Sequence, residues 1–166
     1  IKVVEIDASQ LEPQIAIPHN IDNVTSITEL EGTNIDQAFI GTCANGMLED
    51  LEIAAFILKN KIVKPGVKLI IGPASKRIYL DAVKKGIIEI LVKAGAVILP
   101  PGCGPCTGSH LGIPADGENV ISTGNKNFIG RLGNSKASIY LASPASVELA
   151  SVKGKISDPR KENIYE

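Results

Sequence analysis

The sequence contains no tryptophan, and aromatic residues make up only 4% of its 166 residues. Its core must therefore be aliphatic, which favours a layered α/β fold over a barrel or sandwich stocked with aromatics. No apolar run reaches transmembrane length, and no signal peptide is visible. Because the chain begins with Ile1, we expect it to be processed or to be a piece of something longer.

An excess of charge of one sign is also missing. The formal net charge is −1, and no run of five like charges occurs. These features exclude the usual signatures of nucleic-acid binding and of attachment to a membrane surface. We therefore expect no nucleic-acid or membrane partner, and a cytoplasmic location.

Strand-like and helix-like segments alternate from residue 35 onward. Short apolar runs predict strands at 38–41, 67–71, 96–99, 119–123 and 138–142. Amphipathic or Gly-terminated segments predict helices at 48–59, 76–85, 87–93 and 144–152. The alternation predicts right-handed βαβ units in a three-layer α/β/α domain with a largely parallel sheet. We place this α/β unit at 35–154, between an N-terminal segment (1–34) that opens with a strand over 1–6 and a peripheral tail (155–166).

The chemically notable residues follow three of the predicted strands. Cys43 follows the strand 38–41, Cys103 and Cys106 follow 96–99, and the polar segment 125–131 follows 119–123. Sites in open α/β sheets collect beyond the carboxyl ends of the strands. We therefore expect these three loops to converge on one edge of the sheet.

Three cysteines, two of them spaced as Cys103-Gly-Pro-Cys106, indicate metal or redox chemistry rather than a disulfide framework. Spacing alone leaves a zinc site, a redox dithiol and an iron–sulfur cluster open, and Cys43 alone could be a buried packing residue. Glycines around the cysteines permit the close backbone approach that a cluster needs. Three thiolates would leave one iron of a cubane without a protein ligand, suited to Lewis-acid chemistry.

Several long motifs resemble the aconitase superfamily, specifically the large subunits of 3-isopropylmalate dehydratase and homoaconitase. The motifs occur in the family's order: Phe39-Ile40-Gly41-Thr42-Cys43-Ala44-Asn45-Gly46, Pro100-Pro101-Gly102-Cys103-Gly104-Pro105-Cys106, Ser122-Thr123-Gly124-Asn125-Lys126-Asn127-Phe128-Ile129-Gly130-Arg131, Tyr140-Leu141-Ala142-Ser143-Pro144-Ala145 and Gly154-Lys155-Ile156-Ser157-Asp158-Pro159-Arg160. The resemblance covers nearly the whole chain, but only the third α/β domain of the family, the iron–sulfur domain type.

The resemblance implies a [4Fe–4S] cluster held by Cys43, Cys103 and Cys106. It implies a hydro-lyase that isomerises a hydroxy di- or tricarboxylic acid by dehydration and rehydration, as in leucine biosynthesis. Asn125 and Arg131 would be catalytic, and Lys126 and Arg131 would face substrate carboxylates. Without the resemblance, Asn125 reads as a turn residue and the two cations as surface charges.

The chain departs from the family pattern at Ala44, Thr107 and Lys126. Lysine cannot reproduce the bidentate recognition of a carboxylate that the family's arginine provides at the third of these positions. The implied partners are the remaining large-subunit domains and a small swivel subunit, and we expect the isolated chain to lack turnover. The alternatives are a noncatalytic metal-binding module and a dithiol redox protein using Cys103 and Cys106.

Overall fold

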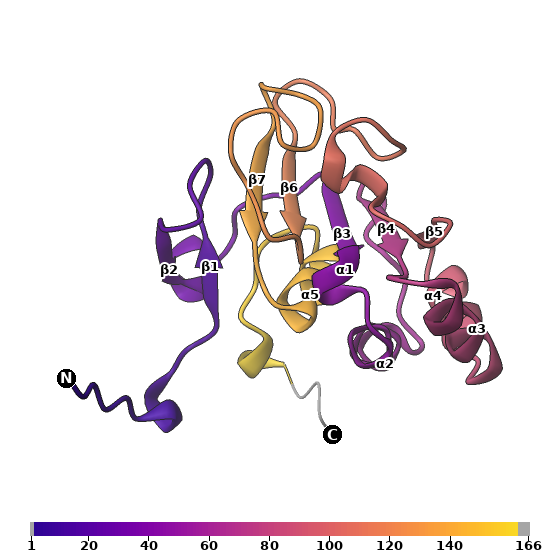
Figure 1. The fold of residues 1–166 in the computed structure, drawn as a ribbon, viewed down its shortest axis with the longest axis horizontal. Helices are drawn as coiled ribbons and strands as arrows, with labels where there is room; N and C mark the ends of the chain where they lie inside the picture. Colours follow the sequence, from indigo (N-terminus) through magenta and orange to yellow (C-terminus); the bar gives the residue numbers. More distant parts are fainter. Residues whose placement is uncertain (1, 163–166) are drawn as a thin grey trace.

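The computed structural model describes residues 2–162, which form one seven-stranded sheet. The strands are β1 (Gln14–Ala16), β2 (Val24–Ser26), β3 (Gln37–Gly41), β4 (Lys68–Gly72), β5 (Val97–Ile98), β6 (Asn119–Ser122) and β7 (Ser138–Leu141). Across the sheet they run in the order β2-β1-β7-β6-β3-β4-β5 (Figure 1). The five strands from β7 to β5 are parallel, and β1 is antiparallel to both of its neighbours.

The helices begin and end at residues that suit helix termini. They are α1 (Thr42–Asn45), α2 (Leu48–Leu58), α3 (Lys76–Lys84), α4 (Ile87–Lys93) and α5 (Pro144–Lys153), with short 3₁₀ helices η1 (Ala8–Gln10), η2 (Ile27–Leu30), η3 (Gly104–Thr107) and η4 (Pro159–Lys161). The hydroxyls of Ser75 and Ser143 accept N–H groups in the first turns of α3 and α5. Among residues 2–162, no helix combines the length and the apolar character that crossing a membrane requires.

The predicted α/β fold with a largely parallel sheet is confirmed, with all five strands and four helices from residue 35 onward close to their expected places. The strand predicted over 1–6 is wrong for residues 2–6, and Ile1 lies outside the described residues. The sequence analysis missed the antiparallel hairpin of β1 and β2, which extends the sheet through β7. The division at residues 34 and 155 stays a prediction, although Ile156 is fully buried against the core.

The two faces of the sheet are covered differently. Side chains alternate along β3, so Ala38 and Ile40 pack with α2, α3, α4 and α5 in the main apolar cluster. Phe39 points to the opposite face, where it packs with Ile70, Leu99 and Cys106. Loops and η3, rather than α-helices, cover the second face, so the second helical layer expected of a three-layer α/β/α domain is not present among residues 2–162. This arrangement places Cys106 directly beneath the sheet.

The order of the strands reverses at β3. The chain passes from β3 through β4 to β5 on one side, and then returns to place β6 and β7 on the other side. Ligands in open α/β sheets bind outside the carboxyl ends of the strands at such a switch point. Cys43 lies in the loop that leaves β3, at this position.

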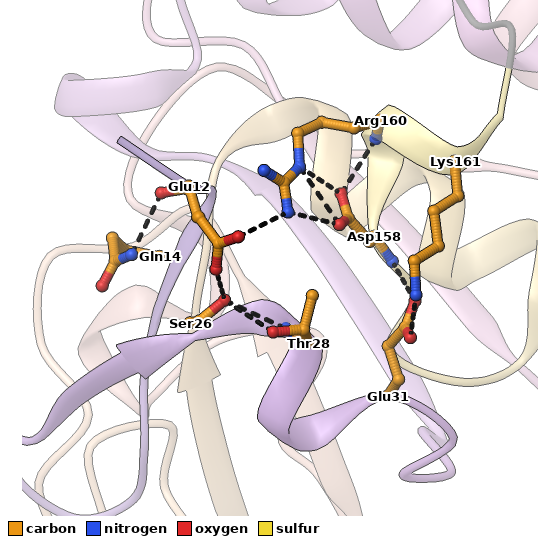
Figure 2. Close-up of polar contacts among 8 residues, drawn as sticks. All are labelled: Glu12, Gln14, Ser26, Thr28, Glu31, Asp158, Arg160 and Lys161. Carbon is orange, nitrogen blue, oxygen red and sulfur yellow. Dashed lines mark hydrogen bonds and ion pairs between the residues drawn. The ribbon is translucent and has the colours of Figure 1, made fainter. Parts of the chain in front are cut away.

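A polar network fastens the N-terminal hairpin to the last helical turn (Figure 2). The guanidinium of Arg160 donates to the carboxylate of Asp158 through Nη2 at 2.7 Å and also reaches Glu12 at 3.3 Å. Hydrogen bonding to Arg160 holds the pKa of the nearly buried Asp158 below its usual value. Nearby, Lys161 pairs with Glu31. These ion pairs therefore hold the N-terminal residues 12–31 against the C-terminal residues 158–161.

One buried carboxyl group lacks a cationic partner. Glu148 on α5 is fully buried, and its Oε1 has no hydrogen-bond partner. The Ser151 hydroxyl lies 3.3 Å from its Oε2. Burial raises the pKa of Glu148 to about 8, so the group is protonated in the folded chain at neutral pH.

Replacing Glu148 with glutamine should remove a pH dependence of stability. The folded-state pKa of Glu148 lies above its unfolded value of 4.5, so its favourable contribution is full below pH 4.5 and declines until about pH 8. Across this window the free energy of unfolding of the parent chain should fall by a few kcal/mol relative to Glu148→Gln, at about 1.4 kcal/mol per pKa unit. Urea unfolding at a series of pH values measures the difference. Glu49→Gln, an exposed control on α2, should follow the parent chain; a pH-independent difference for Glu148→Gln would contradict the prediction.

Replacing Arg160 with alanine should leave the carboxylate of Asp158 buried without its partner. We expect a loss of about 1–3 kcal/mol in the free energy of unfolding. Lys161→Ala removes a more exposed ion pair and should cost less than about 1 kcal/mol. Urea unfolding compares the two variants. Equal losses would show that the ion pair of Arg160 with Asp158 contributes no more to stability than an exposed pair.

Candidate functional site

The loop that carries Cys43 is a tight turn directly after β3. Thr42 is fully buried and has a positive φ of 78°, a conformation that a β-branched residue rarely adopts. Its hydroxyl accepts the N–H of Ala44 at 3.1 Å. Thr42 is the first residue of the single helical turn α1, which carries Cys43 at an exposed position. The backbone is therefore held in a specific, strained shape where it presents this thiol.

Two side chains join this turn to the end of β6. Asn45 Nδ2 donates to the carbonyl of Thr123 at 2.6 Å. The Thr123 hydroxyl accepts the N–H of Gly41 at 3.1 Å and lies 3.4 Å from the carbonyl of the same glycine. The Cys43 turn and the segment after β6 are thus fixed to each other.

The second cysteine loop follows β5 and contains η3. Cys103 is exposed just before η3 and lines a hollow of about 180 Å³ together with His110. Cys106 is buried within η3, against Phe39, Ile70 and Leu99. All three cysteines are free thiols.

The end of β4 lies against both cysteine loops. The N–H of Ala74 donates to the carbonyl of Gly46 at 2.8 Å, on the Cys43 side. The N–H of Gly102 donates to the carbonyl of Pro73 at 3.3 Å, on the side of the cysteine pair. The carboxyl ends of neighbouring parallel strands meet at one edge, and these contacts join the two loops there.

The third predicted loop contacts the cysteine pair through Arg131. Its Nη2 lies 3.4 Å from the sulfur of Cys106, and its guanidinium lies 5.5 Å from the centre of the Phe128 ring. Its Nε is buried without a hydrogen-bond partner. Gly108 and Gly133 are so close that a Cβ on Gly108 would lie 2.6 Å from the N of Gly133. The loops after β5 and β6 are therefore in direct contact.

Of the other two residues expected in this loop, Lys126 lies near the turn between β1 and β2. Asn125 and Lys126 are exposed. Lys126 lines a hollow of about 270 Å³ together with His19 and Phe128. Asn127 is fully buried, and its Nδ2 donates to the carbonyl of Ile17 at 2.8 Å. The hairpin that the sequence analysis missed therefore supports one side of the polar segment.

The three cysteines can be compared with the ligands of a single metal ion and with those of a cubane iron–sulfur cluster. Within residues 2–162, no group of three or more His, Cys, Asp and Glu side chains lies close enough together to hold one metal ion. A cubane cluster is larger, because each thiolate binds a different iron corner and the ligands stand apart. Three free thiols on adjoining Gly-rich loops therefore have the donor chemistry of a cluster, and they fit a single zinc ion less well.

Sequence reasoning missed two residues that organise this edge, Asn45 and Thr123. An Asn before a Gly reads locally as a turn residue, and a Thr at the end of a strand reads as ordinary strand composition. The only available signal was that Asn45 lies two residues after Cys43 and Thr123 two residues before Asn125. Their hydrogen bonds join positions 78 and 82 residues apart in the chain.

The sequence model of the aconitase family (aconitate hydratase) matches residues 27–154. The chain belongs to the aconitase family. This match spans β3 to α5 and includes all three cysteine positions, and it agrees with the largely parallel α/β sheet. The resemblance inferred from the motifs is confirmed.

Several relatives carry the names expected from these motifs. The chain is 56% identical over 160 residues to the 3-isopropylmalate dehydratase large subunit 2 of Archaeoglobus fulgidus, covering 96% of the chain and 38% of the relative. It is 54% identical over 160 residues to the large subunit 1 of Thermotoga maritima, covering 95% and 38%. It is 53% identical over 157 residues to the methanogen homoaconitase large subunit of Methanocaldococcus jannaschii, covering 95% and 37%. The chain thus spans little more than a third of the length of these relatives.

Replacing Gly46 with alanine should disrupt the Cys43 turn. A Cβ there would lie 2.6 Å from the carbonyl oxygen of Gly72 and 2.7 Å from that of Thr42, and backbone atoms cannot move aside cheaply. We expect a loss of about 1–3 kcal/mol in the free energy of unfolding. Gly72→Ala is the matched control, because its Cβ would meet the Phe39 ring at 3.4 Å and the Cα of Gly41 at 4.0 Å, both ordinary contact distances. Urea unfolding of both variants tests the prediction, which fails if Gly46→Ala is no less stable than Gly72→Ala.

Proposed function

We propose that this chain is the cluster-bearing part of a hydro-lyase that isomerises a hydroxy di- or tricarboxylic acid. The observation that supports it most is that three loops at the carboxyl edge of the sheet contact one another, two of them carry the three free thiols, and the third carries Arg131. Cys43 leaves the switch-point strand β3, and Cys106 contacts Arg131. The names of the relatives favour 3-isopropylmalate dehydratase, with homoaconitase as the other choice.

In this proposal Cys43, Cys103 and Cys106 hold a [4Fe–4S] cluster. When bound, a cluster with three protein thiolates supplies one iron that acts as a Lewis acid toward a substrate oxygen. Two of these thiols, Cys43 and Cys103, are exposed, and Cys106 is buried. The apolar neighbours Phe39, Ile70 and Leu99 would shield the Cys106 thiolate from water.

The chain's own cations would bind the substrate. Arg131 presents a planar fork suited to a carboxylate, and its buried Nε still lacks a partner. Lys126 is exposed, five residues earlier in the same segment, and would act as a point charge at a second carboxylate. Asn125, the first residue of the same segment, would lie beside the reacting part of the substrate and orient the substrate hydroxyl.

The overall reaction removes a hydroxyl group and a proton from neighbouring carbons as water, and then adds water back with the two positions exchanged. We propose that the proton-transfer groups come from the parts of the enzyme outside this chain. These parts are the remaining large-subunit domains and a small subunit, because the relatives are named large subunits and are far longer. The expected location is the cytoplasm.

Anaerobic reconstitution with iron and sulfide should load about four irons and four sulfides per chain. Analysis of iron and acid-labile sulfide, together with visible and EPR spectra, measures the loading. Changing Cys43, Cys103 or Cys106 to Ala should abolish it. The loaded chain alone should show no turnover of 3-isopropylmalate or homoaconitate, because its acid–base groups are missing.

A chain that binds no iron, and instead binds one zinc or forms a reversible Cys103–Cys106 disulfide, would refute the proposal. Robust isomerase activity of the chain alone would refute the proposal that the proton-transfer groups come from outside this chain. A cluster that forms, but gives no activity with the complementary domains and small subunit of a relative, would indicate a noncatalytic metal-binding module.

A further inference from the structure

We propose that Asn45 and Thr123 are positioning residues that set where Cys43 stands relative to the cysteine pair, and that this clamp governs how long the cluster is retained. The inference rests on the proposed function and adds to it two residues that hold no ligand themselves. They act through the backbone of the Cys43 turn.

The helical turn α1 cannot hold Cys43 in place by itself. It has four residues, and a helix of one turn gains too few internal hydrogen bonds to offset the entropy of ordering it. Asn45 supplies an external contact, a 2.6 Å hydrogen bond from its Nδ2 to the carbonyl of Thr123. Without that bond, the exposed Cys43 would be held only through its neighbours in the chain, by the contacts of Gly41 with Thr123 and of Gly46 with Ala74.

The turn also needs an external constraint because it is strained. Thr42 adopts a φ of 78°, and such a conformation persists only where the surrounding structure imposes it. Gly41, the residue before Thr42, is held by the buried hydroxyl of Thr123, which contacts both its N–H and its carbonyl group. Thr123 is itself fixed, since its N–H donates to the carbonyl of Phe39 at 3.0 Å.

The same segment continues to the other cysteine loop. It starts at Thr123, which meets the Cys43 turn, and reaches Arg131, which meets the sulfur of Cys106 at 3.4 Å. Its start is stiffened by the hydroxyl of Ser122, which accepts the N–H of Gly124 at 2.9 Å. One continuous piece of chain therefore relates Cys43 to Cys106, and a cluster needs its ligands at set separations.

Outer partners that orient metal ligands typically contribute about 10–100-fold to metal retention. We therefore expect Asn45→Ala to lose its reconstituted cluster to a chelator at least about tenfold faster than the parent chain. Asn119→Ala is the matched control, because it removes a similar hydrogen bond, from Asn119 Nδ2 to the carbonyl of Asn34 at 3.0 Å, at the opposite edge of the sheet. That control should lose its cluster at the parent rate.

A second pair of variants distinguishes positioning from general damage to the fold. Thr123→Val keeps the shape but removes the hydroxyl, and Thr123→Ser keeps the hydroxyl. Valine should speed cluster loss and serine should restore retention. Thermal unfolding of the cluster-free chains shows whether Asn45→Ala and Asn119→Ala are equally stable, and if Asn45→Ala does not fold, the Thr123 pair decides.

The failures of the two proposals are separable. A parent chain that takes up no cluster defeats the proposed function itself. A parent chain that takes up a cluster, with loss rates that are the same for Asn45→Ala, Asn119→Ala and both Thr123 variants, leaves the proposed function standing and overturns the clamp. Faster loss in Asn45→Ala and Thr123→Val alone supports it.

Discussion

The structure depends on the burial of β3 between two parallel neighbours. Every residue of Gln37–Gly41 is buried, and the strand pairs in register with β4 on one side and β6 on the other. A strand in this position must satisfy its backbone through both neighbours, so its direction sets theirs. The carboxyl ends of the parallel strands then lie at one edge, and the chain segments that follow β3, β5 and β6 carry the candidate site residues.

Backbone contacts rather than side-chain bulk shape this edge. Gly46 packs on the carbonyl of Gly72, and Gly108 packs on the backbone of Gly133. Side chains at these positions would push the loops apart, since their Cβ atoms would lie within 2.7 Å of backbone atoms. The glycines flanking the cysteines therefore bring the loops together, and the polar side chains of Asn45, Thr123 and Arg131 then fix their relative positions.

The ends of the chain contribute more than their sequence indicated. Pro13, Pro18 and a polar composition favour irregular structure, yet the β1–β2 hairpin joins the sheet through β7. The energetic reasons are distant in sequence: Ile15 is buried in the main apolar cluster, and Arg160 bridges Glu12 and Asp158. Local propensity could not reveal this pairing, because a strand of three residues is stabilised by the strands beside it rather than by its own sequence.

Patterns in the sequence were enough to predict the class of the fold, the places of five parallel strands and four helices, the family and the candidate cysteines. Hydrophobic periodicity, helix caps and glycines are local signals that can be read from neighbouring residues. The order of the strands, the burial of Cys106 beneath Phe39, its contact with Arg131 and the hydrogen bond from Asn45 to Thr123 became visible in the folded structure alone. Those features arise where loops far apart in sequence meet at the reversal of the sheet, and their energy lies in contacts that no single segment contains.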